Sequence, residues 1–368
     1  MPASWVAATG APSDAILRIS ARSGDTHTSG EAAGYRYLAR VKFGVLQFFS
    51  WPERRIPIAQ VYQRALSRIE IMDRTGYDAV WLAEHHFNSF SVCPSVHLMG
   101  THVAARTQRL RIGTAVTLAA FYHPLRIAEE IALLDVLSGG RVNWGAGRGF
   151  DATEFRAFGV TPQESADRFR EAVEIVLAAW SADRLNYAGR YFSFENIEVL
   201  PKPMQQPHPP VWVAASSEPA VEWAAQRGFT IMMDPHSSHG EIARKRELYR
   251  TRLEAAGHRM DGREIPMARL VAVAETEAKA EEVARSGAGW IVGSYMGKSG
   301  QFFDPKGGPQ KDPIERYLDG IVVYGTPEKV VDDLQRLGEE MFLDYLLAAP
   351  LSHESFLLFT EKVLPKLV

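Results

Sequence analysis

The sequence predicts an α/β protein built as a closed (β/α)8 barrel, and three observations lead to this fold class. Short apolar segments alternate with longer amphipathic segments from residue 41 to the C-terminus. No Pro/Ser-rich linker interrupts this alternation. About eight strand–helix units fit the available length, which favours a closed barrel of parallel strands covered by helices. An open, doubly wound sheet is the structural alternative.

The apolar runs define the expected strands. The first begins at Lys42, and the second reads Asp-Ala-Val-Trp-Leu-Ala. Compact apolar runs of this length, bounded by turn residues, are typical of buried parallel strands. In chain order, strands are expected over 42–49, 78–83, 110–118, 141–146, 210–215, 229–233, 267–273 and 344–349.

The intervening segments carry helical spacing or helix-end signals. Val61, Ala65, Ile69 and Met72 recur at helical intervals. In a later segment, Thr161-Pro162-Gln163-Glu164 has the pattern of a capping box with proline at the first helical position. Helices are expected over 58–75, 94–106, 124–137, 161–179, 218–227, 239–256, 277–286, 327–340 and 354–364.

Three segments differ from this regular pattern. Residues 1–40 are rich in Ala, Ser and Gly without an apolar period, so we expect a disordered N-terminal extension, or a mis-called start with the true one at Val41. Residues 41–368 then form the barrel. Residues 186–210 predict a hairpin that turns at Ala188-Gly189. Residues 297–319, rich in Gly, Pro and charged residues, predict a lid at the catalytic face.

Composition narrows the functional classes. The net charge of −3 offers no global basic field for nucleic acid, and no apolar run reaches the ~18 residues of a membrane helix. The single cysteine, Cys93, excludes an intramolecular disulfide and fits a reducing, cytoplasmic location. We therefore expect a protein that acts on small molecules, without nucleic-acid or membrane partners.

Several known functional motifs are absent from the sequence or do not match it in residue type or spacing. Gly145-Ala146-Gly147-Arg148-Gly149 resembles a dinucleotide fingerprint, but Phe150 stands where its third glycine belongs. The chain has no Gly-x-Ser-x-Gly elbow and no His-Glu-x-x-His motif. Glu84-His85-His86 are consecutive, so neighbouring side chains point to opposite faces of a strand. A metal-dependent barrel hydrolase completed by His97, His102 or His123 stays open as an alternative.

Polar residues at predicted strand ends are the best candidates for chemistry, because that edge of a barrel forms the catalytic mouth. Glu84-His85-His86 end the second strand, Arg148 the fourth, and Ser216-Ser217 the fifth. This pattern, an arginine among glycines together with two serines before a helix, predicts a phosphate-binding pocket. The alternatives are a salt bridge of Arg148 with Glu154, helix capping by the serines, and a core role for His85.

A second polar group follows the sixth predicted strand. It contains Asp234, His236 and His239. Helix capping and contact with solvent are the favoured interpretation of this group.

Nine short motifs in matching order resemble the bacterial luciferase family of flavin-dependent monooxygenases. They are Lys42-Phe43-Gly44, Trp81-Leu82-Ala83-Glu84-His85-His86-Phe87, Gly113-Thr114-Ala115, His123-Pro124, Leu133-Leu134-Asp135, Gly139-Gly140-Arg141, Gly147-Arg148-Gly149, Phe155-Arg156-Ala157-Phe158-Gly159 and Glu222-Trp223-Ala224-Ala225. The resemblance extends from about Val41 to the C-terminus. It implies a (β/α)8 barrel that binds reduced FMN non-covalently.

The resemblance also implies roles for individual residues. His85 matches the family's active-site histidine, and Arg148 matches its phosphate-binding arginine. Ser216, Ser217 and Ala220 lie in the matching phosphate-binding turn, where the luciferase has a hydroxyl residue in place of Ala220.

The expected ring-binding segments are Glu84 and Ala115-Val116, and the family implies a cis peptide bond between Ala115 and Val116. Gly147 belongs to the same cofactor-binding set. It replaces a reactive cysteine of the luciferase catalytic chain, which argues against light emission.

The implied activity is oxygenation of a small organic substrate by O2 through a flavin C4a-hydroperoxide. A separate NAD(P)H-dependent flavin reductase would supply reduced FMN, and a homodimer is expected. An F420-dependent oxidoreductase and a non-catalytic flavin-binding subunit are the alternatives within this superfamily. Phe48, Phe90, Phe121, Tyr122 and Phe150 suggest an apolar or aromatic substrate.

Overall fold

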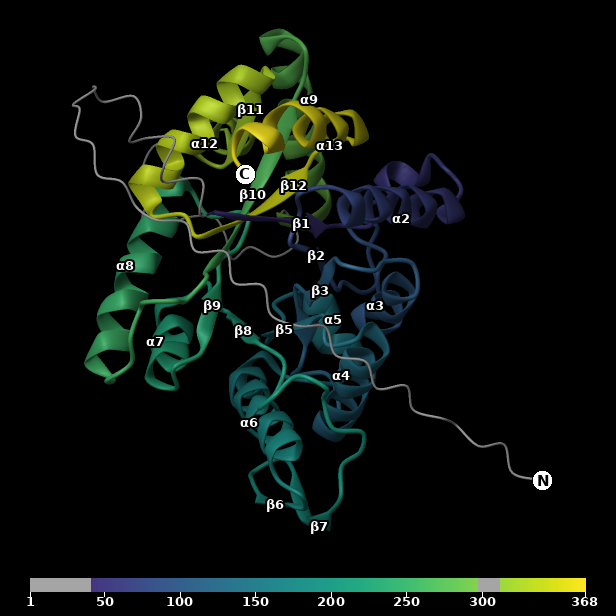
Figure 1. Cartoon of the computed structure of the whole chain (residues 1–368), viewed down its shortest axis with the longest axis vertical. Coiled ribbons are helices and arrows are strands. Elements are labelled where there is room, and N and C mark those ends of the chain that lie inside the picture. Colours follow the sequence, from purple (N-terminus) through teal and green to yellow (C-terminus); the bar gives the residue numbers. More distant parts are fainter. Residues whose placement is uncertain (1–40, 297–311) are drawn as a thin grey trace, which may run out of the picture.

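The computed structural model describes residues 41–296 and 312–368, and within them eight parallel strands form a closed ring (Figure 1). The ring closes because the last strand pairs with the first, and because Met233 and Met267 form a parallel bridge between the sixth and seventh. The predicted barrel is confirmed, and the open sheet is wrong. In order around the ring, the strands are β1 (Lys42–Gln47), β2 (Ala79–Leu82), β3 (Arg111–Thr114), β5 (Val142–Gly147), β8 (Val211–Ala214), β9 (Thr230–Met232), β10 (Pro266–Val273) and β12 (Tyr345–Pro350).

Most of the outer helices lie within a few residues of the predicted ranges. They are α2 (Ile58–Arg74), α3 (Val96–Ala104), α4 (Pro124–Ser138), α6 (Pro162–Ser181), α7 (Glu218–Gln226), α8 (His239–Ala255), α9 (Glu277–Ile291), α12 (Pro327–Met341) and α13 (His353–Leu358). The predicted capping box of Thr161 and Glu164 is present at the start of α6. The predicted hairpin is also present, as β6 (Leu185–Ala188) and β7 (Ser193–Ile197), which pair only with each other.

Several elements were not predicted. The third strand is broken, so that β4 (Thr117–Leu118) pairs with β5 separately. Helix α5 (Ala152–Phe158) follows β5, and β11 (Val322–Gly325) pairs with the second half of β10. Within the expected lid, Pro313–Gly320 form the helix α11, with Tyr317 and Leu318 buried. The rest of the lid up to residue 311, and the expected extension over 1–40, lie outside the described residues.

Alternation along β2 separates two apolar cores. Trp81 and Ala83 belong to the cluster inside the barrel, whereas Val80 and Leu82 belong to the cluster between strands and helices. Trp81 is fully buried, and a Cβ atom added to Gly113 would lie 2.3 Å from its Cδ2 atom. The barrel interior is therefore packed with side chains, as expected for this fold.

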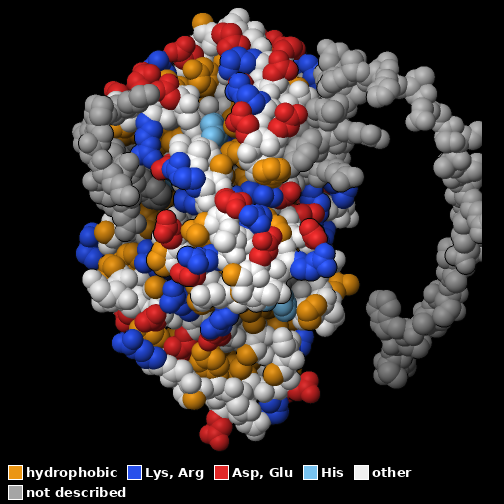
Figure 2. Space-filling model, turned by 90° about the vertical axis from the view of Figure 1, so that its left-hand side faces the viewer, with side chains coloured by type: hydrophobic (Ala, Val, Ile, Leu, Met, Phe, Trp, Pro, Cys, Tyr) orange, Lys and Arg blue, Asp and Glu red, His pale blue; other side chains and the backbone are white. Residues whose placement is uncertain are grey.

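The surface is mixed in charge. On the face shown in Figure 2, acidic and basic side chains are interspersed, with no continuous basic area. No helix in the described ranges is both long and apolar enough to cross a membrane.

The turn after β9 is held by buried polar contacts. The Asp234 carboxylate accepts hydrogen bonds from the backbone N–H groups of His236 and Ser237, at 2.9 and 2.8 Å, and pairs with Lys245 at 3.1 Å. The fully buried Arg269 guanidinium donates to the carbonyl oxygens of Ser237 and Asp234. His236 is only 5% exposed. Its predicted solvent contact is therefore wrong, and Ser238 rather than Asp234 caps α8.

Burial lowers the pKa of His236 to about 4, although the Asp234 carboxylate acts in the opposite direction. As the pH falls, the His236 imidazole is protonated near pH 6.5 in the unfolded chain but only near pH 4 in the folded chain. Stability from this residue is present above pH 6.5 and falls as the pH drops toward 4. Between pH 7 and 4, we expect the free energy of unfolding of the wild type to fall by up to ~3 kcal/mol more than that of His236→Gln.

Urea unfolding across this pH range measures the difference. His102→Gln is the control, because His102 is exposed. Equal pH slopes for the wild type and His236→Gln would contradict the prediction.

Candidate active site

His85 lies at the mouth of the barrel. It continues the inward direction of Trp81 and Ala83 beyond the end of β2, and it is 9% exposed. Its ring stacks on Phe48 with centroids 6.3 Å apart and meets Phe90 edge-on at 5.4 Å. The sequence-based placement at the catalytic face agrees with this geometry.

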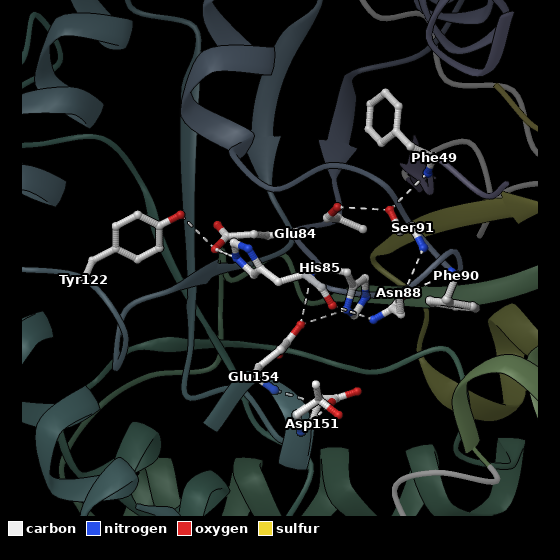
Figure 3. A network of polar contacts seen from close by, with 12 residues as sticks. Phe49, Glu84, His85, Asn88, Phe90, Ser91, Tyr122, Asp151 and Glu154 are labelled. Carbon is white, nitrogen blue, oxygen red and sulfur yellow. Dashed lines mark hydrogen bonds and ion pairs between the residues drawn. The ribbon is translucent and has the colours of Figure 1, made fainter. Parts of the chain in front are cut away.

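Glu154 is the residue of this site that sequence analysis missed as a functional group. Its Oε1 atom accepts a hydrogen bond from the His86 backbone N–H at 2.9 Å and lies 3.9 Å from His85 Nδ1. Asp151 caps α5, which carries Glu154 into this position (Figure 3). The capping pattern of Asp151 before Thr153 and Glu154 is the signal that could have revealed the helix. The proposed salt bridge between Arg148 and Glu154 is absent among the described contacts.

Glu84 lies on the other side of the strand end, with His86. Its Oε1 atom accepts hydrogen bonds from Tyr122 Oη at 2.9 Å and from His86 Nε2 at 3.0 Å. Figure 3 shows Tyr122 pointing toward Glu84. Burial, reinforced by the Glu84 charge, raises the pKa of Tyr122, so the phenol keeps its proton and remains a donor. Glu84 Oε2 is buried and accepts no hydrogen bond from the described residues.

A second group of predicted residues gathers at the ends of β5 and β8. These strands pair, with Ala146 opposite Val213, so Arg148 and Ser216-Ser217 follow on neighbouring strands. Arg148 is half-buried and makes no hydrogen bond or ion pair with residues in the described ranges. Ser217 is the N-cap residue of α7, but its side chain makes no capping hydrogen bond. The capping alternative is therefore wrong for Ser217.

The predicted ring-binding segment Ala115-Val116 lies beside this group. The Ala115–Val116 peptide bond is cis, which confirms the prediction. A Cβ atom added to Gly147 would lie 2.3 Å from Val116 Cγ2 and 3.5 Å from Ala214 Cβ. Glycine at this position thus lets β5 approach the cis segment closely. The Ala220 N–H donates to the Ser217 carbonyl oxygen at 3.0 Å, inside the first turn of α7.

The histidines near the mouth are engaged with carboxylates or hydroxyls. His97 contacts Glu130 at 2.7 Å and Thr117 at 3.1 Å, and His86 contacts Glu84. No group of three metal-ligating side chains converges within the described part of the chain.

The residues present fit a flavin phosphate and its ring system. The Arg148 guanidinium has no carboxylate partner among the described residues, and Ser217 has a hydroxyl that the helix does not use. Both are suited to a phosphate, because arginine and a helix N-terminus bind anions by charge and by N–H donors. Gly147 packs closely on Val116 next to them and leaves no space there for a larger side chain.

A separate cavity of about 860 Å³ opens beside the mouth. It lies between α2 and α9 and is lined by Phe48, Phe90 and Trp290, among others. Arg148 and Ser217 do not line it. The cavity is therefore separate from the group at the ends of β5 and β8.

Among curated proteins, the oxygenase component of the flavin-dependent trigonelline monooxygenase from Acinetobacter baylyi is 33% identical over 48% of this chain and 49% of its own length. The alkanal monooxygenase alpha chain from Photorhabdus luminescens is 28% identical over 72% of this chain and 78% of its own length. The chain spans about half the length of the curated relatives that it matches at 33% to 39% identity.

Solved structures share the fold across almost the whole chain. Monooxygenase RslO1 from Streptomyces bottropensis has a TM-score of 0.78 at 26% identity, covering 89% of this chain and 100% of its own. The oxygenating constituent of 3,6-diketocamphane monooxygenase from Pseudomonas putida, solved with FMN, has a TM-score of 0.75 at 20% identity, covering 89% and 99%. The sequence profile of luciferase-like monooxygenases matches residues 41–344. The chain therefore belongs to the luciferase-like monooxygenase family.

Proposed function

We propose that this chain is the oxygenase component of a two-component monooxygenase. It binds reduced FMN non-covalently, receives it from a separate NAD(P)H-dependent flavin reductase, and uses O2 to oxygenate a small organic substrate. The observation that carries this proposal is that, within the described residues, Arg148 makes no ion pair and the Ser217 side chain makes no capping hydrogen bond, beside the cis Ala115–Val116 segment. The relative named as an oxygenase component and the fold relative solved with FMN support the same proposal.

The chain's own residues divide the work. Arg148, Ser216 and Ser217 would hold the phosphate, and Ala115, Val116 and Gly147 would support the ring system. When bound, reduced FMN supplies the electrons that activate oxygen. His85 is the residue placed to exchange a proton or a hydrogen bond with the reacting groups, since its imidazole points into the mouth. Glu154, 3.9 Å from His85 Nδ1, would place a carboxylate charge beside the imidazole.

Replacing Arg148 tests the phosphate assignment. A charge-assisted hydrogen bond contributes ~1.5–3 kcal/mol, so Arg148→Ala should weaken reduced FMN binding roughly ten- to a hundredfold while leaving riboflavin binding nearly unchanged. Anaerobic titration with the two flavins measures this contrast. Arg156→Ala is the control, because Arg156 is exposed and contacts only Thr153 among the described residues. Equal losses for FMN and riboflavin would make Arg148 a structural residue, and tighter binding of F420 than of FMN would favour the F420-dependent alternative.

Replacing His85 tests its catalytic role. We expect His85→Ala to fold and bind FMN normally but to oxidise substrate ~10²–10⁴-fold more slowly, with oxygen released as hydrogen peroxide. His86→Ala should affect turnover less, because the His86 ring points to Glu84 and Phe158 instead of the mouth. Product formation and peroxide release with reduced FMN are measured for both variants. Normal oxygenation by His85→Ala would remove the assignment, and a failure to fold would favour the core-histidine alternative.

We also propose a homodimer formed through α3 and α4. These helices pack together and expose Leu98, Leu133 and Leu137, which are 76%, 47% and 57% accessible. Large exposed apolar side chains on packed helices are typical of an interface between subunits. Sedimentation should give the mass of a dimer for the wild type and of a monomer for Leu98→Glu/Leu137→Glu. Phe342→Asp, at the exposed C-cap of α12, is the control, and a monomeric wild type would contradict the proposal.

A further inference from the structure

The ring of Tyr295 is enclosed by four other rings at the barrel mouth. Tyr295 is 6% exposed and lies in the short π-helix η2 (Val292–Met296) after α9. It stacks on Phe90 with centroids 4.1 Å apart and an interplanar angle of 15°. His85 and Phe150 meet it edge-on, both at 5.2 Å, and His236 lies tilted at 5.4 Å. We call His85, Phe90, Phe150 and His236 the aromatic box.

The walls of the box come from the segments that follow β2, β5 and β9, and hydrogen bonds fix three of the four walls. The His85 backbone N–H donates to the Cys93 carbonyl oxygen at 3.2 Å, and the Phe90 N–H donates to Asn88 Oδ1 at 3.0 Å. His236 Nδ1 contacts Tyr317 Oη at 3.1 Å, and its backbone is held by Asp234. A stacking face and two perpendicular edges form the geometry in which aromatic rings attract one another. The box is thus shaped for a planar aromatic ring.

The box borders one of the proposed flavin anchors, because Ala115 and Val116 pack against the same buried cluster as Phe90 and Tyr295. None of its walls is Arg148, Ser217 or the cis Ala115–Val116 segment. The cavity of about 860 Å³ shares Phe90 with the box and reaches the mouth from the side of α2 and α9. One wall of the box, Phe90, therefore also borders a cavity.

We propose that the aromatic box is the subsite for a neutral or cationic aromatic ring of the organic substrate, which takes the place of the Tyr295 ring next to His85. As an assignment of substrate class, this inference rests on the proposed monooxygenase function. It specifies where the ring lies, which residues contact it, and which catalytic side chain it meets.

The charges around the box favour this class of ring. Burial raises the pKa of Tyr295 well above its usual value, and the carboxylates of Glu154, Asp151 and Asp234 act in the same direction. These surroundings oppose a negative charge in the box. Aromatic faces attract cations, so a neutral or positively charged ring fits better than an aromatic anion.

The test uses the full chain without flavin. NMR titration compares 4-methylphenol, which has the size of a tyrosine side chain, with 4-methylcyclohexanol and 4-methylbenzoate. We expect the wild type to bind 4-methylphenol at least tenfold more tightly than either of the others. Phe90→Leu should reduce the preference for 4-methylphenol over 4-methylcyclohexanol to less than threefold, whereas Phe169→Leu, a buried ring beside Trp223, should leave it unchanged.

Two further measurements decide the location. Tyr295→Ala should bind 4-methylphenol at least tenfold more tightly than the wild type, because no internal ring competes; if that variant does not fold, the wild-type and Phe90→Leu titrations decide. Saturating reduced FMN, without oxygen, should leave the Kd of 4-methylphenol within threefold of its flavin-free value.

Equal binding of 4-methylphenol and 4-methylcyclohexanol would overturn the proposal, as would a preference that survives Phe90→Leu or an absence of binding in both the wild type and Tyr295→Ala. Exclusion of 4-methylphenol by FMN would also overturn it and assign the box to the flavin ring. Because the first titrations contain no flavin, their failure leaves the proposed flavin chemistry standing. A failure to bind FMN would refute that chemistry and leave the box assignment to the titrations.

Discussion

The alternation of side chains along β2 is the constraint on which the rest of the site depends. Trp81 must point inward, because it fills the barrel between Trp212 and Tyr345 and occupies the space that a side chain at Gly113 would need. With a period of two, Ala83 and His85 follow inward and Glu84 and His86 outward. A shift of one residue would exchange the two histidines and place a carboxylate in the mouth.

The two carboxylates beside this strand end support that arrangement. Glu84 accepts from Tyr122 and His86 on the outer side, and Glu154 accepts from the His86 N–H next to His85. Burying a carboxylate costs free energy unless the carboxylate accepts hydrogen bonds. Losing these bonds would therefore be costly, and both carboxylates hold the strand end in this position. Helix α5 is short, but its capping by Asp151 brings Glu154 across the mouth.

The sequence predicts the barrel well because strands and helices are local. Apolar runs and the capping box lie within single segments, and His85, Arg148 and Ser217 follow from the rule that strand ends face the mouth. What the sequence does not predict depends on contacts between distant segments. The pairing of β11 with β10, the burial of His236 and the position of Tyr295 against His85 all join parts of the chain that no periodicity connects. The sequence suggests Glu154 only as a partner for Arg148, whereas in the structure its carboxylate accepts a hydrogen bond from the His86 backbone N–H.

The proposed phosphate site and the aromatic box differ in the interactions that they offer. The ends of β5 and β8 present the Arg148 guanidinium and the Ser217 hydroxyl. The box instead presents ring faces and edges, which the Tyr295 ring contacts. Removing Tyr295 from the box forfeits its burial, ~1.5–3 kcal/mol for a large side chain, together with its ring contacts. An incoming aromatic ring restores both, so the exchange is nearly balanced. An aliphatic ligand of the same size restores only the burial, and the structure therefore discriminates against it before any chemistry begins.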